Sequence, residues 1–203
     1  MTKGARNLMS HIKESEVSNK MNELMTLEEF KYNVEEAYEY ELDDMDIDLM
    51  FVDSYTRGAL LNNIINESSI EIKYYLLIKW WGLIDDGHSL FNVNDVEEWL
   101  SFVKVKLDLS DLNYDAEGYV TVYRGENQNS NSHKNGAFSW TTSSSVAEGF
   151  ARGLRERTIY AKKPILITGK VHKSKILGRL DGREEFELLC KDVSVHEEKK
   201  LRN

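Results

Sequence analysis

Apolar side chains recur at helical spacing through the first half of the chain. Thr26-Leu27-Glu28-Glu29 has the pattern of a capping box, in which a hydroxyl and a carboxylate satisfy the free amides of a first helical turn. Apolar residues follow at intervals of about one helical turn, at Phe30, Val34 and Tyr38. The same pattern predicts helices over residues 46–66, over 72–81 after the cap-like Ser68-Ser69, and over 94–102, with a loop over 82–92. The first half is therefore predicted to be mostly helical.

The pattern changes after Tyr114. Residues 115–118 indicate a turn, and residues 119–124 are rich in β-branched and aromatic side chains, which is typical of a strand. Further strands are predicted over 137–142, 165–171 and 183–190 and around Val193 and Val195, with a short helix capped at Ser145. We therefore predict an α+β fold in three parts: a flexible arm over 1–22, a helical N-terminal region over 23–113, and a β-rich lobe over 114–203.

The stretch around Glu185-Phe186-Glu187 combines an apolar row with two carboxylates. Because alternate residues of a strand share a face, Phe186, Leu188 and Cys190 are predicted to face the core. Glu185 and Glu187 would then lie side by side on the opposite face, where each carboxylate disfavours ionisation of the other. That arrangement favours a functional site, although this stretch alone is explained more simply as a half-buried strand with an acidic outer face.

Charge and composition exclude some classes of function. The formal net charge of −9 argues against a protein that follows the phosphates of nucleic acid, but it does not exclude a small anionic ligand. The single cysteine, Cys190, rules out an internal disulfide and a cysteine-rich zinc site. The longest apolar run, over residues 74–84, is interrupted by Lys79 and is too short to cross a bilayer. We therefore expect a soluble, cytoplasmic protein without membrane contact.

Two further stretches of the β-rich lobe carry candidate chemistry. Tyr123-Arg124-Gly125 ends a predicted strand, where an arginine can bind a phosphate and a glycine allows close approach of backbone. Phe138-Ser139-Trp140-Thr141-Thr142-Ser143 collects hydroxyls at another strand end, with a tryptophan that could stack on a flat ring. Each has a structural alternative: a surface arginine before a turn, and serines that cap a helix beside a core tryptophan.

Taken in order, an arginine, a Thr-Thr-Ser stretch and a Glu-x-Glu strand, these features resemble the mono-ADP-ribosyltransferases of the Arg–Ser–Glu type. The resemblance covers residues 119–195. It implies an NAD-binding lobe of two small packed sheets, NAD as co-substrate without a metal, and a protein target, as in phage- or bacterium-encoded effectors. It also implies a transferase that releases nicotinamide and passes ADP-ribose to an acceptor, with arginine favoured.

The resemblance assigns roles residue by residue. It implies that Arg124 binds the NAD pyrophosphate, that Glu187 is the catalytic carboxylate and that Glu185 engages the acceptor. Thr141, where the family usually has serine, would support the nicotinamide pocket and Glu187. The backbone of Gly125 would meet the nicotinamide amide, and residues 180–183 would form the acceptor loop. The further residues expected to contact the cofactor are Tyr123, Trp140, Thr142 and Ser143.

The chemistry of the residues agrees with these roles. Cleavage of the bond between nicotinamide and ribose builds positive charge on the ribose, which a nearby carboxylate stabilises. A second carboxylate can accept a proton from an incoming guanidinium or hydroxyl. Gly182 stands where arginine-modifying relatives carry an aromatic residue. Two other functions therefore remain open: an NAD glycohydrolase, and a non-catalytic acidic protein that binds and inhibits a basic partner.

The remaining polar candidates do not form a recognisable site. His133, His172 and His196 lack the spacing of metal ligands. The acidic run of Asp43, Asp44, Asp46 and Asp48 lacks the glycine and closing glutamate of a calcium loop. Cys190 falls on the predicted core face, so we expect an inert thiol. The aromatic stretch over residues 74–81 is predicted to be core.

Overall fold

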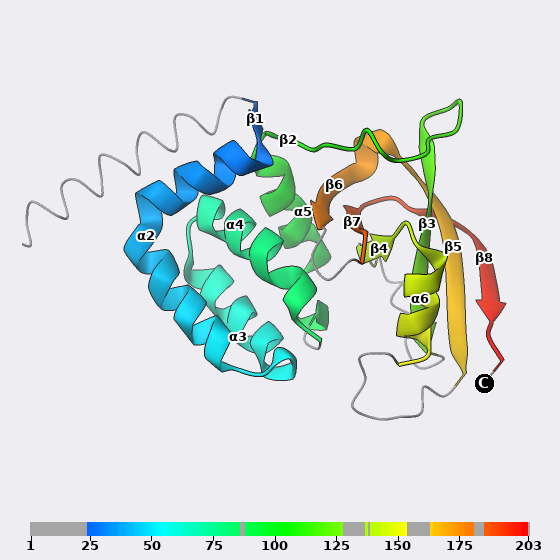
Figure 1. Ribbon diagram of the computed structural model, residues 1–203, viewed down its shortest axis with the longest axis horizontal. Coiled ribbons are helices and arrows are strands. Elements are labelled where there is room, and N and C mark those ends of the chain that lie inside the picture. The colour runs from blue at the N-terminus through cyan, green and yellow to red at the C-terminus, as the bar shows by residue number, and fades with distance from the viewer. Residues whose placement is uncertain are drawn as a thin grey trace, which may run out of the picture. The chain divides into compact units, whose positions relative to one another are not determined.

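The computed structural model describes residues 24–85, 88–127, 137, 139–153, 163–180 and 185–202. The predicted arm over 1–22 lies outside these residues. The chain divides into two compact units, Met1–Asp108 and Leu109–Asn203, whereas the sequence placed this division at 113/114. The fold is α+β, with the helices α2 to α5 in the first unit and a six-stranded sheet in the second (Figure 1).

The first unit is a group of helices around α4. Its longer helices are α2 (Leu27–Phe51), α3 (Ser54–Glu67), α4 (Ile70–Trp80) and α5 (Val93–Phe102), and α4 contacts the other three. Short 3-10 helices cover Trp81–Leu83 and His88–Leu90, in the segment predicted as a loop. A two-stranded parallel sheet joins β1 (Met25–Thr26) to β2 (Val105–Lys106).

Local caps explain where these helices begin. The Thr26 hydroxyl accepts from the Glu29 amide while Glu29 accepts from the Thr26 amide, so the predicted capping box is confirmed. Ser69 caps α4 as predicted. The helix predicted over 46–66 is wrong, because the chain leaves the helix at Val52 and Asp53 starts a new one by accepting from two amides.

The core of the first unit is aromatic. The predicted burial of residues 74–81 is confirmed for Tyr74, which is 1 % exposed, and for Trp81, which is also 1 % exposed. The Tyr74 ring meets Phe30 of α2 edge-on, with ring centroids 4.8 Å apart. Burial raises the pKa of the Tyr75 phenol to about 12, and its hydroxyl donates to Glu35 over 2.6 Å. These contacts join α4 to the buried face of α2.

The second unit contains a six-stranded antiparallel sheet with the strand order β6-β7-β4-β3-β5-β8. The strands are β3 (Tyr119–Asn127), β4 (Ser139–Thr141), β5 (Pro164–His172), β6 (Ile176–Leu180), β7 (Glu187–Cys190) and β8 (Ser194–Lys200). The predicted strands over 119–124 and 165–171 and around Val195 are confirmed. Residues 176–180 form a further strand, β6, which the sequence pattern did not predict.

The strand pairing in this sheet is shortest between β3 and β4. Among the described residues, nine pairs join β3 to β5, whereas one pair, Tyr123 with Thr141, joins β3 to β4. The sequence resemblance implied two small packed sheets in this lobe. The described strands instead form one sheet, made of the strand groups β6-β7-β4 and β3-β5-β8 (Figure 1). The pair of Tyr123 and Thr141 joins the two groups.

Helix α6 (Ser144–Ala151) packs directly on β3. A Cβ atom placed on Gly125 would lie 1.8 Å from the Ala147 carbonyl oxygen and 2.5 Å from the Ala151 nitrogen, so only glycine allows this approach. Ser143 caps α6 by accepting from the Val146 amide, in place of the predicted Ser145. The helix thereby fixes the segment that runs from β4 into α6.

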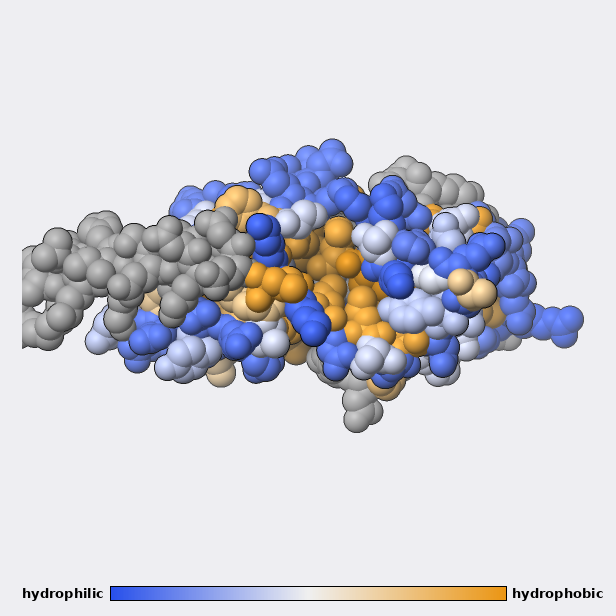
Figure 2. Space-filling model, turned by 90° about the horizontal axis from the view of Figure 1, so that it is seen from above, coloured by the Kyte–Doolittle hydropathy of each residue, from blue (hydrophilic) through white to orange (hydrophobic). Residues whose placement is uncertain are grey.

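Hydrophilic residues cover most of the surface seen in Figure 2, with smaller apolar areas among them. Within the described part of the chain, none of the helices has both the length and the apolar character needed to span a bilayer.

Candidate functional site

Arg124 lies where β3 and β4 separate. Its Nε donates to Glu126 Oε1 over 2.7 Å, and its Nη1 donates to the Ser139 carbonyl oxygen over 2.6 Å. The Arg124 side chain is 24 % exposed, whereas the Glu126 side chain is 2 % exposed. A buried carboxylate thus orients a partly exposed guanidinium. A guanidinium presents its N–H donors in a planar fork, which is the geometry that binds carboxylate and phosphate groups.

Ser139 links this arginine to the Glu-x-Glu stretch. Its carbonyl oxygen accepts from Arg124, and its hydroxyl donates to Glu187 Oε1. Glu126, Arg124, Ser139 and Glu187 therefore form one continuous chain of hydrogen bonds. This chain spans the junction between the two halves of the sheet, and we call it the Arg124–Ser139–Glu187 chain.

The register of the sheet decides which side chains share a face. Tyr123 pairs with Thr141, and Thr141 pairs with Glu187, so these three side chains lie on one face. Arg124 follows Tyr123 and points to the other face. The structure therefore joins Arg124 to Glu187 through Ser139 at the strand junction, while their side chains leave the sheet in opposite directions.

Thr141 holds the backbone before Glu187. Its Oγ1 donates to the Glu185 carbonyl oxygen over 2.6 Å and accepts from the Ser143 amide over 3.1 Å. The Thr142 amide donates to the Phe186 carbonyl oxygen over 3.2 Å. Thr141 was predicted to support Glu187. It instead fixes the main chain at Glu185, while Ser139 contacts the Glu187 carboxylate.

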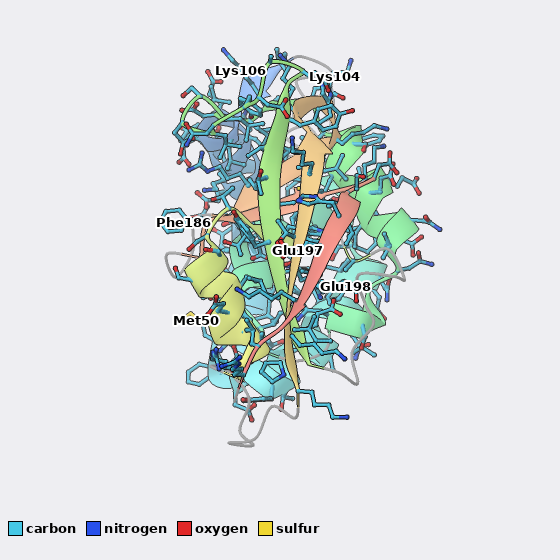
Figure 3. All side chains as sticks on the ribbon, turned by 90° about the vertical axis from the view of Figure 1, so that its right-hand side faces the viewer. Met50, Lys104, Lys106, Phe186, Glu197 and Glu198 are labelled. Atoms are coloured by element: carbon cyan, nitrogen blue, oxygen red, sulfur yellow. The ribbon has the colours of Figure 1, made fainter. Side chains whose placement is uncertain are left out.

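The predicted alternation along Glu185-Phe186-Glu187 is wrong. The strand begins only at Glu187, and Phe186 has a φ of 49°, in the left-handed region. This conformation turns the Phe186 ring outward, where it is 49 % exposed and projects from the ribbon (Figure 3). Glu185 and Glu187 are nevertheless both buried, at 7 % and 9 % exposure. The two carboxylates flank an outward-facing aromatic residue instead of standing on one regular strand face.

Three residues expected to contact a cofactor have structural roles. Trp140 is 2 % exposed and donates from Nε1 to the Ala137 carbonyl oxygen, so its ring belongs to the core and cannot stack on a ligand in this conformation. Ser143 caps α6. Glycine is required at position 125 because α6 packs so closely on β3, and this requirement holds whether or not the Gly125 backbone contacts a ligand. Tyr123 and Thr142 are partly exposed beside the chain of hydrogen bonds. Residues 181–183 of the expected acceptor loop lie outside the described residues.

Sequence reasoning assigned no role to Ser139 or Glu126. Glu126 could have been found, because residues two apart on a strand share a face and an acid there can pair with Arg124. Ser139 was part of the hydroxyl-rich stretch, but its contact with Glu187 joins residues far apart in the chain. That contact depends on the pairing of β4 with β7, which the sequence does not specify.

The site is rich in acid. In the part of the chain that the structure describes, the junction carries three buried carboxylates, those of Glu126, Glu185 and Glu187, together with the partly exposed Arg124. A carboxylate in such a partly desolvated position stabilises positive charge more strongly than it would in water. Glu187 therefore suits a group that carries or develops positive charge, and Arg124, whose side chain leaves the other face of the sheet, suits an anionic group.

Two of the other polar candidates, Cys190 and His172, lie among the described residues. Cys190 is 1 % exposed, and burial raises the pKa of its thiol far above the usual range, which agrees with the predicted inert core residue. His172 bonds through Nδ1 with Ser174, and His133 lies outside the described residues. Among the residues that the structure describes, no group of three His, Cys, Asp or Glu side chains is arranged to hold a metal ion.

The chain of hydrogen bonds predicts a positioning role for Ser139. Replacing Ser139 with alanine should lower the free energy of unfolding by about 2 kcal/mol, because the Glu187 carboxylate loses a donor. If Glu187 acts on a bound substrate, its misplacement should lower kcat by about 100-fold with little change in KM. Ser139→Thr keeps the hydroxyl and should retain most of the free energy of unfolding and most of kcat.

Urea unfolding and steady-state kinetics test this expectation, with Ser194→Ala on the exposed strand β8 as the control. An unchanged kcat in Ser139→Ala would show that the hydroxyl does not position Glu187.

Comparisons with known proteins do not assign this chain to a family. No family model matches it, and searches of curated proteins and of solved structures found no significant match.

Proposed function

We propose that the chain is a mono-ADP-ribosyltransferase, which cleaves NAD and transfers ADP-ribose to a protein acceptor. The observation that carries the proposal is the Arg124–Ser139–Glu187 chain, which brings an arginine, a hydroxyl and a buried carboxylate from three strands to one junction of the sheet. These three groups match the chemistry of the Arg–Ser–Glu arrangement that the sequence resembles.

Glu187 is suited to the bond-breaking step. In NAD, the nicotinamide ring is a cation bonded to the ribose C1′ atom. As that bond breaks, its electron pair leaves with neutral nicotinamide and positive charge develops on the ribose. Glu187 is buried and held by Ser139, so its negative charge is fixed before the reaction begins. A preorganised charge of this kind stabilises the transition state without reorganisation of solvent.

Arg124 is suited to bind the diphosphate. Its guanidinium is partly exposed and is held in place by Glu126 and Ser139. Because the guanidinium is preorganised, little side-chain entropy is lost when it forms a bidentate contact with a phosphate. The neighbouring carboxylates oppose a diphosphate elsewhere at the junction, so the diphosphate is expected at Arg124.

Glu185 is suited to activate the acceptor. It precedes the outward-turned Phe186, and Thr141 fixes its main chain. A carboxylate there can accept the proton that an incoming guanidinium or hydroxyl gives up when its nitrogen or oxygen bonds to C1′. The products are nicotinamide and an ADP-ribosylated acceptor, with arginine favoured as the acceptor.

A transfer experiment tests this function. Purified protein is incubated with NAD labelled in its adenylate part, together with polyarginine or with polylysine. We expect label to join polyarginine preferentially, and Arg124→Lys to raise KM for NAD by at least about 10-fold, because lysine lacks the bidentate fork. Label found only as free ADP-ribose would identify a glycohydrolase instead. No turnover and no NAD binding at millimolar concentration would favour a non-catalytic acidic binding protein.

A further inference from the structure

Helix α2 is apolar on two opposite faces. Beyond a break at Tyr38, where φ and ψ leave the helical range, its residues Leu42 and Leu49 are 2 % and 0 % exposed and pack into the first unit. Tyr40, Ile47 and Phe51 recur at intervals of seven and four residues, so they lie on one face as well. Because Tyr40 and Leu42 are two positions apart, that second face is turned away from the buried one.

The second face is open to solvent. Tyr40 is 81 % exposed, Ile47 51 % and Phe51 87 %, and the neighbouring Met50 is 68 % exposed. Single exposed apolar side chains are common, but a row of them on one helix face marks an interaction surface. These side chains add little to the stability of the helix, because tyrosine, isoleucine and phenylalanine have lower helix propensity than alanine or glutamate.

Acidic residues border this apolar row. Asp43, Asp44 and Asp48 are exposed and lie beside or between its members. No lysine or arginine occurs between Tyr32 and Phe51. Asp46, by contrast, faces the unit itself, where it accepts from Trp80 Nε1 over 2.8 Å and from Lys79. The acids on the open face are therefore additional to those that hold α2 to α4.

We propose that this face of α2, defined by Tyr40, Ile47, Met50 and Phe51 with Asp43, Asp44 and Asp48, docks a basic amphipathic helix of a partner protein. An apolar row on the partner would cover the α2 row, and flanking lysines or arginines would meet the aspartates. The same acids disfavour the other occupants: anionic lipid, nucleic acid and a second copy of this face all bring like charge to it. The proposal does not depend on NAD chemistry.

A synthetic peptide tests the proposal with the full chain. The probe is a leucine–lysine amphipathic helix about five turns long, and the matched peptide carries glutamate in place of lysine. We expect the lysine peptide to bind with a Kd in the micromolar range, as measured by fluorescence anisotropy, and the glutamate peptide not to bind. Tyr40→Ser with Phe51→Ser should weaken binding at least about 10-fold, because the apolar contact is lost.

Charge variants test whether peptide binding depends on the aspartates of this face or only on the net charge of the protein. Neutralising Asp43, Asp44 and Asp48 to asparagine should weaken binding and reduce its dependence on salt. The control neutralises the same number of exposed acids elsewhere, Glu98→Gln, Glu117→Gln and Glu197→Gln, and should leave binding unchanged.

Several results would overturn the proposal. Equal binding by wild type and by both face variants would show that the peptide responds only to overall charge, and absence of binding at millimolar peptide would show that the face is not a docking site. Self-association lost in Phe51→Ser would identify a second copy as the occupant, and co-sedimentation with phosphatidylserine vesicles would identify a membrane. Circular dichroism checks that the variants keep their helices.

Discussion

Replacing Glu187 with glutamine is expected to reduce the release of nicotinamide from NAD by about 1,000-fold or more. Glutamine keeps the size of the side chain and an oxygen that can accept from Ser139, so the fold and the hydrogen bond should survive. It removes the negative charge that stabilises the ribose cation in the transition state. Loss of one such preorganised group typically costs two to three orders of magnitude in kcat. Nicotinamide release followed by chromatography measures the effect.

Two comparisons make this result specific. Glu197→Gln removes an equivalent charge from the exposed face of β8 and should be as active as wild type (Figure 3). Glu185→Gln should reduce transfer to polyarginine by about 100-fold while hydrolysis of NAD falls less, because only transfer needs a base for the acceptor. Retained turnover in Glu187→Gln would remove Glu187 from its role. Equal loss of transfer and hydrolysis in Glu185→Gln would remove Glu185 from acceptor activation.

Replacing Gly125 with alanine is expected to cost about 3 kcal/mol or more of unfolding free energy, at the upper end of overpacking effects. The new methyl would meet the Ala147 carbonyl oxygen and the Ala151 nitrogen, which are backbone atoms and cannot rotate away. Helix α6 must therefore move off β3, and the segment from Thr141 to Ser143 would move with it. Urea unfolding should show the loss, with a fall in Tm of roughly 10 °C.

A double variant distinguishes backbone crowding from side-chain crowding. Trimming Ala147 to glycine does not move its carbonyl oxygen, so Gly125→Ala with Ala147→Gly should be at least as unstable as Gly125→Ala alone. Thr121→Ala, on the same strand, is the control for an alanine in β3 and should cost no more than about 1 kcal/mol. Rescue by Ala147→Gly, or near-normal stability of Gly125→Ala, would contradict the packing described for α6.

Features set by neighbouring residues could be predicted from the sequence. The capping box at Thr26 and the cap at Ser69 depend on residues within one helical turn, and both are present. The break between α2 and α3 was missed because apolar periodicity continues across it, although Asp53 followed by Ser54 and Tyr55 carries the signal of an N-cap.

The site depended on contacts that local patterns do not encode. Arg124, Thr141 and Glu187 were chosen from their order along the chain, but which groups touch is decided by strand pairing. Pairing of β4 with β7 brings Ser139 to Glu187, and the left-handed Phe186 breaks the alternation on which the Glu-x-Glu prediction rested. Phenylalanine gives no local indication of that conformation, since glycine and asparagine are the residues that usually adopt it.

The most direct test measures whether the wild-type protein releases nicotinamide from millimolar NAD, with NAD in buffer alone as the reference. If the acids and the arginine at the sheet junction act together as proposed, nicotinamide should appear in amounts equal to the sum of free and acceptor-bound ADP-ribose. Nicotinamide production no faster than in buffer, with polyarginine present as acceptor, would contradict the account.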